Sequence, residues 1–173
     1  MTHLIPMADA AFAANIPPGY DIAGGYYGGP RAYQVWPAAE WGLFPGYKLP
    51  IWVGGDEGHP EGQEAAAELA ALGVPAGSIT VLDMETRKDR TYVAAFGAVM
   101  QQAGYRVWVY GSAATVGLNP PLNGYWIADY TDSAATIDHL LGLPHVRAVQ
   151  YANLPGFDKS WVKAWTEGEM WHG

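Results

Sequence analysis

The chain lacks cysteine altogether and carries few charges. Without cysteine the protein has no disulfide framework, no thiolate metal ligand and no cysteine nucleophile. Nine residues are Lys or Arg and 17 are Asp or Glu, which gives a formal net charge of −8. Nucleic acids and anionic membranes bind through clustered cations, so the composition argues against both partners. No stretch reaches the roughly 18 uninterrupted apolar residues that a membrane-spanning helix needs.

The N-terminal segment lacks the pattern of a secretory signal. It has no basic start, and Asp9 interrupts its apolar stretch. We therefore expect no signal peptide, which favours delivery by a phage or a lysis system, or within a larger assembly, over ordinary secretion. At 173 residues, half of them hydrophobic, the chain is expected to form one domain with a sizeable core.

Aromatic side chains are in excess. They make up 13% of the residues, against 15% for all charged side chains together, and eight of them are tryptophan. Trp and Tyr combine an apolar face with a polar edge, which suits a ligand with flat apolar faces such as a sugar. The alternative is that these rings simply fill the core.

Short β-rich runs alternate with helical patterns along the chain. One helix is expected at 60–72, with a proline and acids in its first turn and a glycine after its end. A second is expected at 91–103, where apolar residues recur at helical spacing. Strands separated by such helices predict right-handed βαβ units and a parallel sheet. The predicted strands span residues 3–7, 22–27, 48–54, 78–83, 106–110, 125–128 and 146–150, with an eighth near 157–162.

The strand spacing leaves two architectures open, a doubly wound sheet and a barrel. The interval from Leu82 to Val109 is 27 residues, whereas that from Val109 to Ile127 is 18. Pro120-Pro121 argues against a full helix in this second interval. A complete eightfold β/α barrel usually needs about 200 residues or more, so a barrel of this length requires reduced helices in its C-terminal part.

The usual nucleotide, zinc and serine-hydrolase motifs are absent. The chain has no Gly-x-Gly-x-x-Gly after its first strand, no phosphate loop, no His-Glu-x-x-His and no Gly-x-Ser-x-Gly. Its five histidines are scattered, so a zinc site would have to be assembled from unrelated positions.

The sequence Asp83-Met-Glu85 is the most informative feature. An apolar strand leads directly into two carboxylates at positions i and i+2, which share one side of a strand. Parallel α/β folds place their sites at the carboxyl ends of strands, and two close carboxylates separate each other's pKa values, as glycosidic hydrolysis requires. The alternative is that both acids favour the N-terminus of the helix that follows.

Polar or aromatic groups recur at the other predicted strand ends. They form a rim around the paired acids, and they comprise Asp9, Tyr110-Gly-Ser112, Tyr125-Trp-Ile-Ala-Asp-Tyr130, Gln150-Tyr151 and Asp158.

In this order, these motifs resemble glycoside hydrolase family 25, the Chalaropsis-type lysozymes. They are more similar still to the glycoside-hydrolase-like relatives of that family in actinobacterial and phage proteins, of which the stretch from residue 50 to residue 85 is typical. The resemblance covers nearly the whole chain. It implies an α/β fold, a modified TIM-like β/α barrel of about eight strands whose last helices are reduced to strands and loops.

The resemblance also implies roles for individual residues. Glu85 would be the general acid that protonates the glycosidic oxygen. Asp83 would orient or polarise the substrate, assisting attack by the substrate's own N-acetyl group, and Asp9 and Asp158 would complete the acidic floor. No metal or organic cofactor is expected. The residues expected to line the sugar cleft are Tyr110, Trp126, Tyr130, Gln150 and Tyr151.

Two functions remain open at this point. The first is a muramidase-like or lysozyme-like glycosidase that acts on peptidoglycan or a related cell-wall glycan. The second is a carbohydrate-binding or structural module without turnover, in a phage virion or a cell-wall assembly. Residues 1–160 are expected to form the barrel. The Trp-rich segment 161–173, with Trp161, Trp165 and Trp171, either forms an interface for self-association or an assembly partner, or folds back over the barrel.

Overall fold

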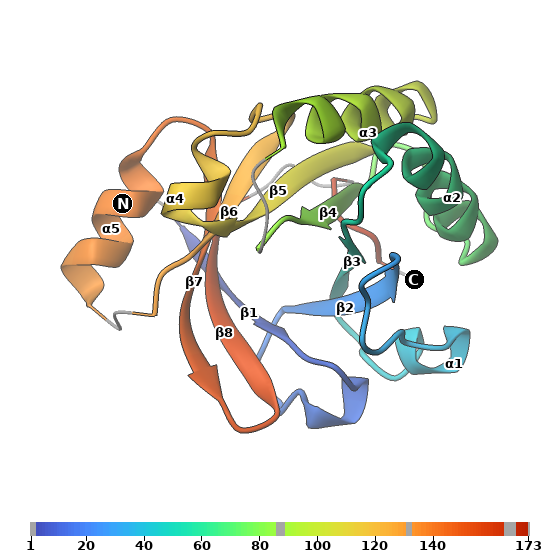
Figure 1. Ribbon diagram of the computed structural model, residues 1–173. Helices are drawn as coiled ribbons and strands as arrows, with labels where there is room; N and C mark the ends of the chain where they lie inside the picture. Colours follow the sequence, from blue (N-terminus) through green and yellow to red (C-terminus); the bar gives the residue numbers. More distant parts are fainter. Residues whose placement is uncertain (1–2, 86–88, 131–132, 165–168, 173) are drawn as a thin grey trace.

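Eight strands close into a barrel (Figure 1). The computed structural model describes residues 3–85, 89–130, 133–164 and 169–172. Each strand pairs with the next in the chain, and the last pairs with the first. This confirms the predicted modified TIM-like barrel and excludes the doubly wound sheet. The strands are β1 (Leu4–Asp9), β2 (Ile22–Gly28), β3 (Tyr47–Val53), β4 (Ile79–Asp83), β5 (Arg106–Ser112), β6 (Gly124–Ala128), β7 (Val146–Leu154) and β8 (Phe157–Lys163).

The last strand departs from the parallel sheet that βαβ units predict. Strands β1 to β7 are parallel, whereas β8 runs antiparallel to both of its neighbours. Only Pro155 and Gly156 separate β7 from β8, and so short a connection makes a hairpin, because a parallel pair needs a crossover of about a dozen residues or more. Asp158 therefore lies opposite Asp9, and Lys163 lies opposite Leu4 at the other end of the barrel.

Helices cover the barrel unevenly (Figure 1). The two long helices, α2 and α3, correspond to the two predicted helices, and they pack against each other. Helix α4 is a single turn, and no helix separates β7 from β8, in agreement with the reduced C-terminal part. Helix α5 was not predicted, although Ile137, Leu140 and Leu141 bury one of its faces. The helices are α1 (Ala38–Trp41), α2 (Gly58–Ala71), α3 (Arg90–Gln102), α4 (Ala113–Val116) and α5 (Ala134–Gly142).

Alternation along the strands builds two apolar layers. In β3, Ile51 packs in the cluster inside the barrel, whereas the next residue, Trp52, packs in the outer cluster with α2 and α3. In β4, Val81 and Leu82 divide between the same two layers. Each of these side chains is almost completely buried, and burial of a large apolar side chain contributes about 1.5–3 kcal/mol.

The Trp-rich segment packs on the barrel where the structure describes it. Trp161 belongs to β8, so the boundary expected at residue 160 falls inside a strand, and its ring stacks on Tyr151 at 6.0 Å. Trp171 is buried against Trp41, and its carbonyl oxygen accepts a hydrogen bond of 2.8 Å from the backbone N–H of Lys48. Trp165 lies outside the described residues. Trp171 is thus part of the protein's own core rather than of an exposed patch.

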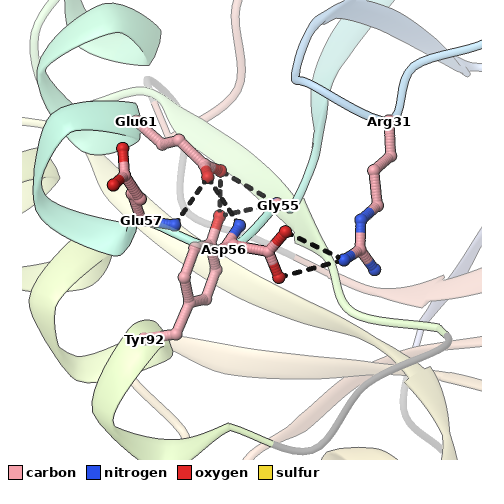
Figure 2. A network of polar contacts seen from close by, with 6 residues as sticks. All are labelled: Arg31, Gly55, Asp56, Glu57, Glu61 and Tyr92. Atoms are coloured by element: carbon pink, nitrogen blue, oxygen red, sulfur yellow. Dashed lines mark hydrogen bonds and ion pairs between the residues drawn. The ribbon is translucent and has the colours of Figure 1, made fainter.

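A buried carboxylate organises the loop between β3 and α2 (Figure 2). Glu61 accepts backbone N–H hydrogen bonds from Gly55 at 2.9 Å, Asp56 at 2.8 Å and Glu57 at 2.9 Å, and a 2.5 Å bond from the Tyr92 hydroxyl on α3. Burial opposes the charge, but these bonds outweigh it and lower the pKa of Glu61 below its usual 4.5. The carboxylate therefore fixes the loop and joins α2 to α3.

The same loop positions a cation on the neighbouring loop. Asp56 accepts hydrogen bonds of 3.0 and 3.3 Å from one guanidinium nitrogen of Arg31, which follows β2 (Figure 2). Both side chains are largely exposed, so this ion pair contributes little stability. Its effect is to orient Arg31.

We expect Glu61→Gln to lower the free energy of unfolding by roughly 2–4 kcal/mol, because an amide NH₂ would then face the donors that surround this position. Chemical denaturation at pH 7 measures the loss. Because the folded-state pKa of Glu61 is depressed, its contribution is present above about pH 4.5 and declines as pH falls further, so the two proteins should converge in acid.

The matched control is Glu64→Gln, the same chemical change at an exposed position of the same helix. It should alter stability by less than about 0.5 kcal/mol. Equal effects of the two substitutions would contradict the assigned role of Glu61.

Candidate functional site

Four carboxylates gather at one end of the barrel, where the parallel strands have their carboxyl ends. Asp9 ends β1, Asp83 ends β4, and Glu85 follows two residues later. The reversed direction of β8 brings Asp158 to the same end, in register with Asp9. Asp9 is buried, Asp83 and Asp158 are half-buried, and Glu85 is exposed.

Gln150 connects the acids to two tyrosines. Its side chain is fully buried, and its amide nitrogen donates to both carboxylate oxygens of Asp9, at 3.1 and 3.3 Å, and to Asp158 at 3.3 Å. Its amide oxygen accepts from the hydroxyls of Tyr110, at 2.6 Å, and Tyr130, at 2.9 Å. The donors and acceptors are thus matched, which fixes the orientation of the amide.

Asp83 and Glu85 are joined by a tight turn. The backbone N–H of Glu85 donates to a carboxylate oxygen of Asp83 at 2.9 Å, which is the local bond that Asp side chains commonly make two residues on. The helix-capping alternative for this pair is not met. Helix α3 begins at Arg90, and its cap is Asp89, whose side chain accepts from the N–H of Tyr92 at 2.9 Å.

The surroundings of three of these carboxyl groups favour their protonated forms. Burial raises the pKa of Asp9 to about 8, with a further contribution from the charge of Asp158. Burial likewise raises the pKa of Asp83 to about 7, and the nearby charge of Glu85 adds to the effect. For Asp158, burial and then Glu85 raise the pKa to about 6. Near neutral pH the cluster therefore holds exchangeable protons, as general acid–base chemistry requires.

A glycine makes room for the buried acid. A Cβ atom at Gly24, the register partner of Asp9 on β2, would lie 2.6 Å from the Cβ of Asp9. The neighbouring Gly25 leaves similar space for the ring of Trp36, whose indole N–H donates to the carbonyl oxygen of Ala10 at 3.0 Å. The Gly24-Gly25 pair thus serves side-chain packing around Asp9.

A cavity of about 350 Å³ opens beside Asp83 and Glu85. The segment after β2 also lines the cavity, through Arg31, Tyr33 and Gln34. The Tyr33 side chain is 97% exposed. Sequence reasoning missed these three residues, because the Gly-Gly-Pro break marks a loop there but no motif distinguishes the residues that follow it.

The predicted cleft residues divide into two groups. Tyr110, Tyr130 and Gln150 lie together with the acids. Trp126 lies beneath Tyr110, with ring centroids 4.6 Å apart; it is 1% exposed and donates its indole N–H to Ser160. Tyr151 points away from this group, because it follows Gln150 on β7 and packs against Trp161 on the outside of the barrel.

Metal and membrane features are absent from the part of the chain that the structure describes. No three His, Asp or Glu side chains there are grouped to hold a metal ion. No helix there is long and apolar enough to cross a membrane.

We expect Asp9→Asn to stabilise the protein at pH 8 and to do so less at pH 5, because less of the wild-type carboxyl's contribution has been lost at the lower pH. The raised folded-state pKa means that the stability contributed by this carboxyl is complete below about pH 3.8 and is lost as pH rises through about 8. Asparagine keeps an oxygen that accepts from Gln150 without needing a proton. At about 1.4 kcal/mol per pKa unit, reduced by local relaxation, the gain at pH 8 should be roughly 1–3 kcal/mol.

Denaturation of both proteins at the two pH values measures this difference. Asp138→Asn, the same change at an exposed position of α5, is the control and should show no such pH dependence. A loss of stability at pH 8 in the Asp9 variant would contradict the assignment.

The fold of this chain is shared with solved structures. No family model and no curated protein matches the chain. Among solved structures, an uncharacterized B. stearothermophilus protein is similar over 96% of this chain and 100% of that one, with a TM-score of 0.69 and 18% identity. The modular Cpl-1 endolysin, complexed with a peptidoglycan analogue, is similar over 96% of this chain and 57% of that one, with a TM-score of 0.67 and 17% identity.

A muramidase from Acremonium alcalophilum is similar over 94% of this chain and 95% of that one, with a TM-score of 0.61 and 14% identity. Identities this low carry the likeness of fold, not of activity. The chain therefore has the fold of the family-25 muramidases, and it shares that fold with an uncharacterized protein as well.

Proposed function

We propose that the protein is a muramidase-like glycosidase that hydrolyses peptidoglycan or a related bacterial cell-wall glycan. The observation that carries this proposal is the convergence of Asp9, Asp83, Glu85 and Asp158 at one end of the barrel, beside a cavity. Glycosidases divide acid and electrostatic roles between such carboxyl groups. The fold shared with the muramidases, including an endolysin complexed with a peptidoglycan analogue, supports the same reaction class.

Glu85 is the general acid in this proposal. It is exposed at the cavity, where it is accessible to the glycosidic oxygen, and it donates a proton as the bond from that oxygen to C1 breaks. Asp83, held by the N–H of Glu85, orients the substrate's N-acetyl group so that its carbonyl oxygen attacks C1. Water then opens this intermediate at C1 and returns a proton to Glu85.

Asp9 and Asp158 act as the floor of the site. Asp9 is buried behind Gln150 and so does not meet the substrate directly, but its protonation sets the charge below the reacting sugar. The hydroxyls of Tyr110 and Tyr130 both donate to Gln150, which in turn donates to Asp9. These hydrogen bonds couple the protonation of Asp9 to the tyrosines at the rim of the site.

The second candidate function is glycan binding without turnover. Two tyrosines with exposed rings, Tyr33 at 97% and Tyr130 at 50%, lie among the residues around the acids and suit stacking on sugars. Such a surface would hold a glycan whether or not the bond is cut. Delivery by a phage, and action at the cell wall, remain predictions under either function.

We expect Glu85→Gln to reduce release of reducing ends from purified peptidoglycan by roughly 10²–10⁴-fold, the usual contribution of general acid–base catalysis. Because the side chain is exposed, the melting temperature should not change. Glu64→Gln, an exposed change of the same kind on α2, should keep full activity.

The outcomes separate the two candidate functions. Hydrolysis by the wild type and loss of it in the Glu85 variant support the enzyme. Retained glycan binding with no release of reducing ends by the wild type, over a broad pH range, would refute hydrolysis and favour the binding module.

We expect Tyr33→Ala to weaken glycan binding by roughly 2- to 10-fold without altering stability, because the ring offers a stacking face and is 97% exposed. Tyr33→Phe keeps the ring and should bind as the wild type does. Isothermal titration with a soluble wall oligosaccharide measures both variants, and equal binding by Tyr33→Ala and the wild type would remove Tyr33 from the site.

A further inference from the structure

A second cavity, of about 420 Å³, opens at the opposite end of the barrel, and we call it the basal cavity. Ile79 and Arg106 begin β4 and β5, and both line it. Arg147, near the start of β7, and Lys163, the last residue of the antiparallel β8, complete its cationic lining. The basal cavity is therefore separated from Asp83 and Glu85 by the length of β4.

The charge of the basal cavity is unusual for this protein. Three of only nine Lys and Arg residues line it, in a chain whose net charge is −8. Arg106 forms an ion pair with Glu169, which offsets one of the three charges. Among the described residues, no carboxylate forms an ion pair with Arg147 or Lys163.

The charges of Arg147 and Lys163 act on each other. Burial lowers the pKa of Lys163, and the positive charge of Arg147 lowers it further. The two positive charges repel each other, although the chain as a whole has an excess of carboxylates. A bound anion would relieve this repulsion.

Arg147 is an exposed residue that lines the cavity, and a glycine makes room for its stem. A Cβ atom at Gly124, the first residue of β6, would lie 2.3 Å from the Cγ of Arg147, so the glycine leaves the space that the arginine stem occupies. The Nε of Arg147 donates to the carbonyl oxygen of Asn123 at 3.5 Å, a long bond that leaves both terminal nitrogens of the guanidinium available.

Asn123 contributes a neutral donor. Its side-chain oxygen accepts from the backbone N–H of Val107 at 2.9 Å, which fixes the amide and leaves its NH₂ group to serve the cavity that it lines. The basal cavity thus presents a guanidinium, an ammonium and an amide, and each of the three comes from a different segment of the chain.

We propose that the basal cavity binds a phosphate monoester through Arg147 and Lys163. A monoester carries about −1.5 to −2 charges at neutral pH, which matches the charges of Arg147 and Lys163, neither of which is in an ion pair with a described residue. The planar guanidinium suits a pair of phosphate oxygens, while the ammonium and the amide suit the third. The volume exceeds that of a bare phosphate, so the phosphoryl group belongs to a small organic molecule such as a polyol or sugar phosphate.

The test is isothermal titration of the intact protein with glycerol 3-phosphate, in parallel with inorganic phosphate, dimethyl phosphate and succinate. We expect saturable 1:1 binding of glycerol 3-phosphate and weaker binding of dimethyl phosphate, which carries a single charge. Arg147→Ala and Lys163→Ala should each weaken binding at least tenfold, whereas Lys163→Arg should retain it. The matched control is Arg90→Ala, which removes one cation at the start of α3 and should bind as the wild type does.

Thermal unfolding gives an independent readout. Without ligand, Lys163→Ala should leave the melting temperature unchanged or raise it, because it removes a repulsion. With glycerol 3-phosphate the wild type should melt at a higher temperature and the variant should not.

Each outcome decides the proposal. Absence of saturable binding at millimolar glycerol 3-phosphate, or binding that neither substitution weakens, would overturn it. Succinate bound as tightly as the phosphate would overturn the assignment to phosphate. Tighter binding of inorganic phosphate than of the ester would keep the site but make free phosphate its ligand. None of these results depends on hydrolysis by the carboxylates at the other end.

Discussion

Closure of the barrel by an antiparallel strand is the constraint on which the site depends. A two-residue hairpin turns β8 back between β7 and β1, and this reversal sets Asp158 opposite Asp9. With a parallel eighth strand, the same residue would begin the strand at the amino end of the barrel. The acidic floor is therefore a product of topology as much as of residue identity, since one acid ends its strand and the other begins it.

The buried amide of Gln150 lowers the free-energy cost of placing Asp9 and Asp158 side by side. Two half-satisfied carboxylates in an apolar barrel would repel each other strongly, but one amide donates to both and also accepts from two tyrosines. Its polarity is set by its partners, so hydroxyl groups lie on one side and acids on the other. The buried carboxyl group of Glu61, on the loop beside the cavity, behaves in the opposite way. Four donors converge on it, so it stays charged, whereas the surroundings of Asp9 favour the protonated form.

Much of the scaffold was readable from periodicity and strand ends. Helices α2 and α3 and all eight strands lie where apolar patterns, prolines and glycines predict them, and the shortened spacing after Val109 anticipates the reduced helices. The strand ends also indicated Asp9, Asp83, Gln150 and Asp158. The antiparallel direction of β8 was missed, although the short interval between the predicted strands 146–150 and 157–162 leaves no room for the crossover that a parallel pair needs. Tyr151 was predicted to line the cleft together with Gln150. Adjacent residues of a strand face opposite sides, and Tyr151 packs outside the barrel. Arg31 and Tyr33 lie on a loop that no motif marks, and the contact of Arg31 with Asp56, 25 positions further along the chain, exists only in the folded protein.

The bond between Gln150 and Asp9 joins residues 141 positions apart. During synthesis at about 5–20 residues per second, β1 leaves the ribosome roughly 7–28 s before its partner residue does. Throughout that interval its outer edge has no strand to pair with, and an unpaired edge invites association with other chains. The acidic floor therefore cannot form before β8 has been synthesised, and folding of this barrel is expected to be slow for its size, because its closing contacts are the most distant in the sequence.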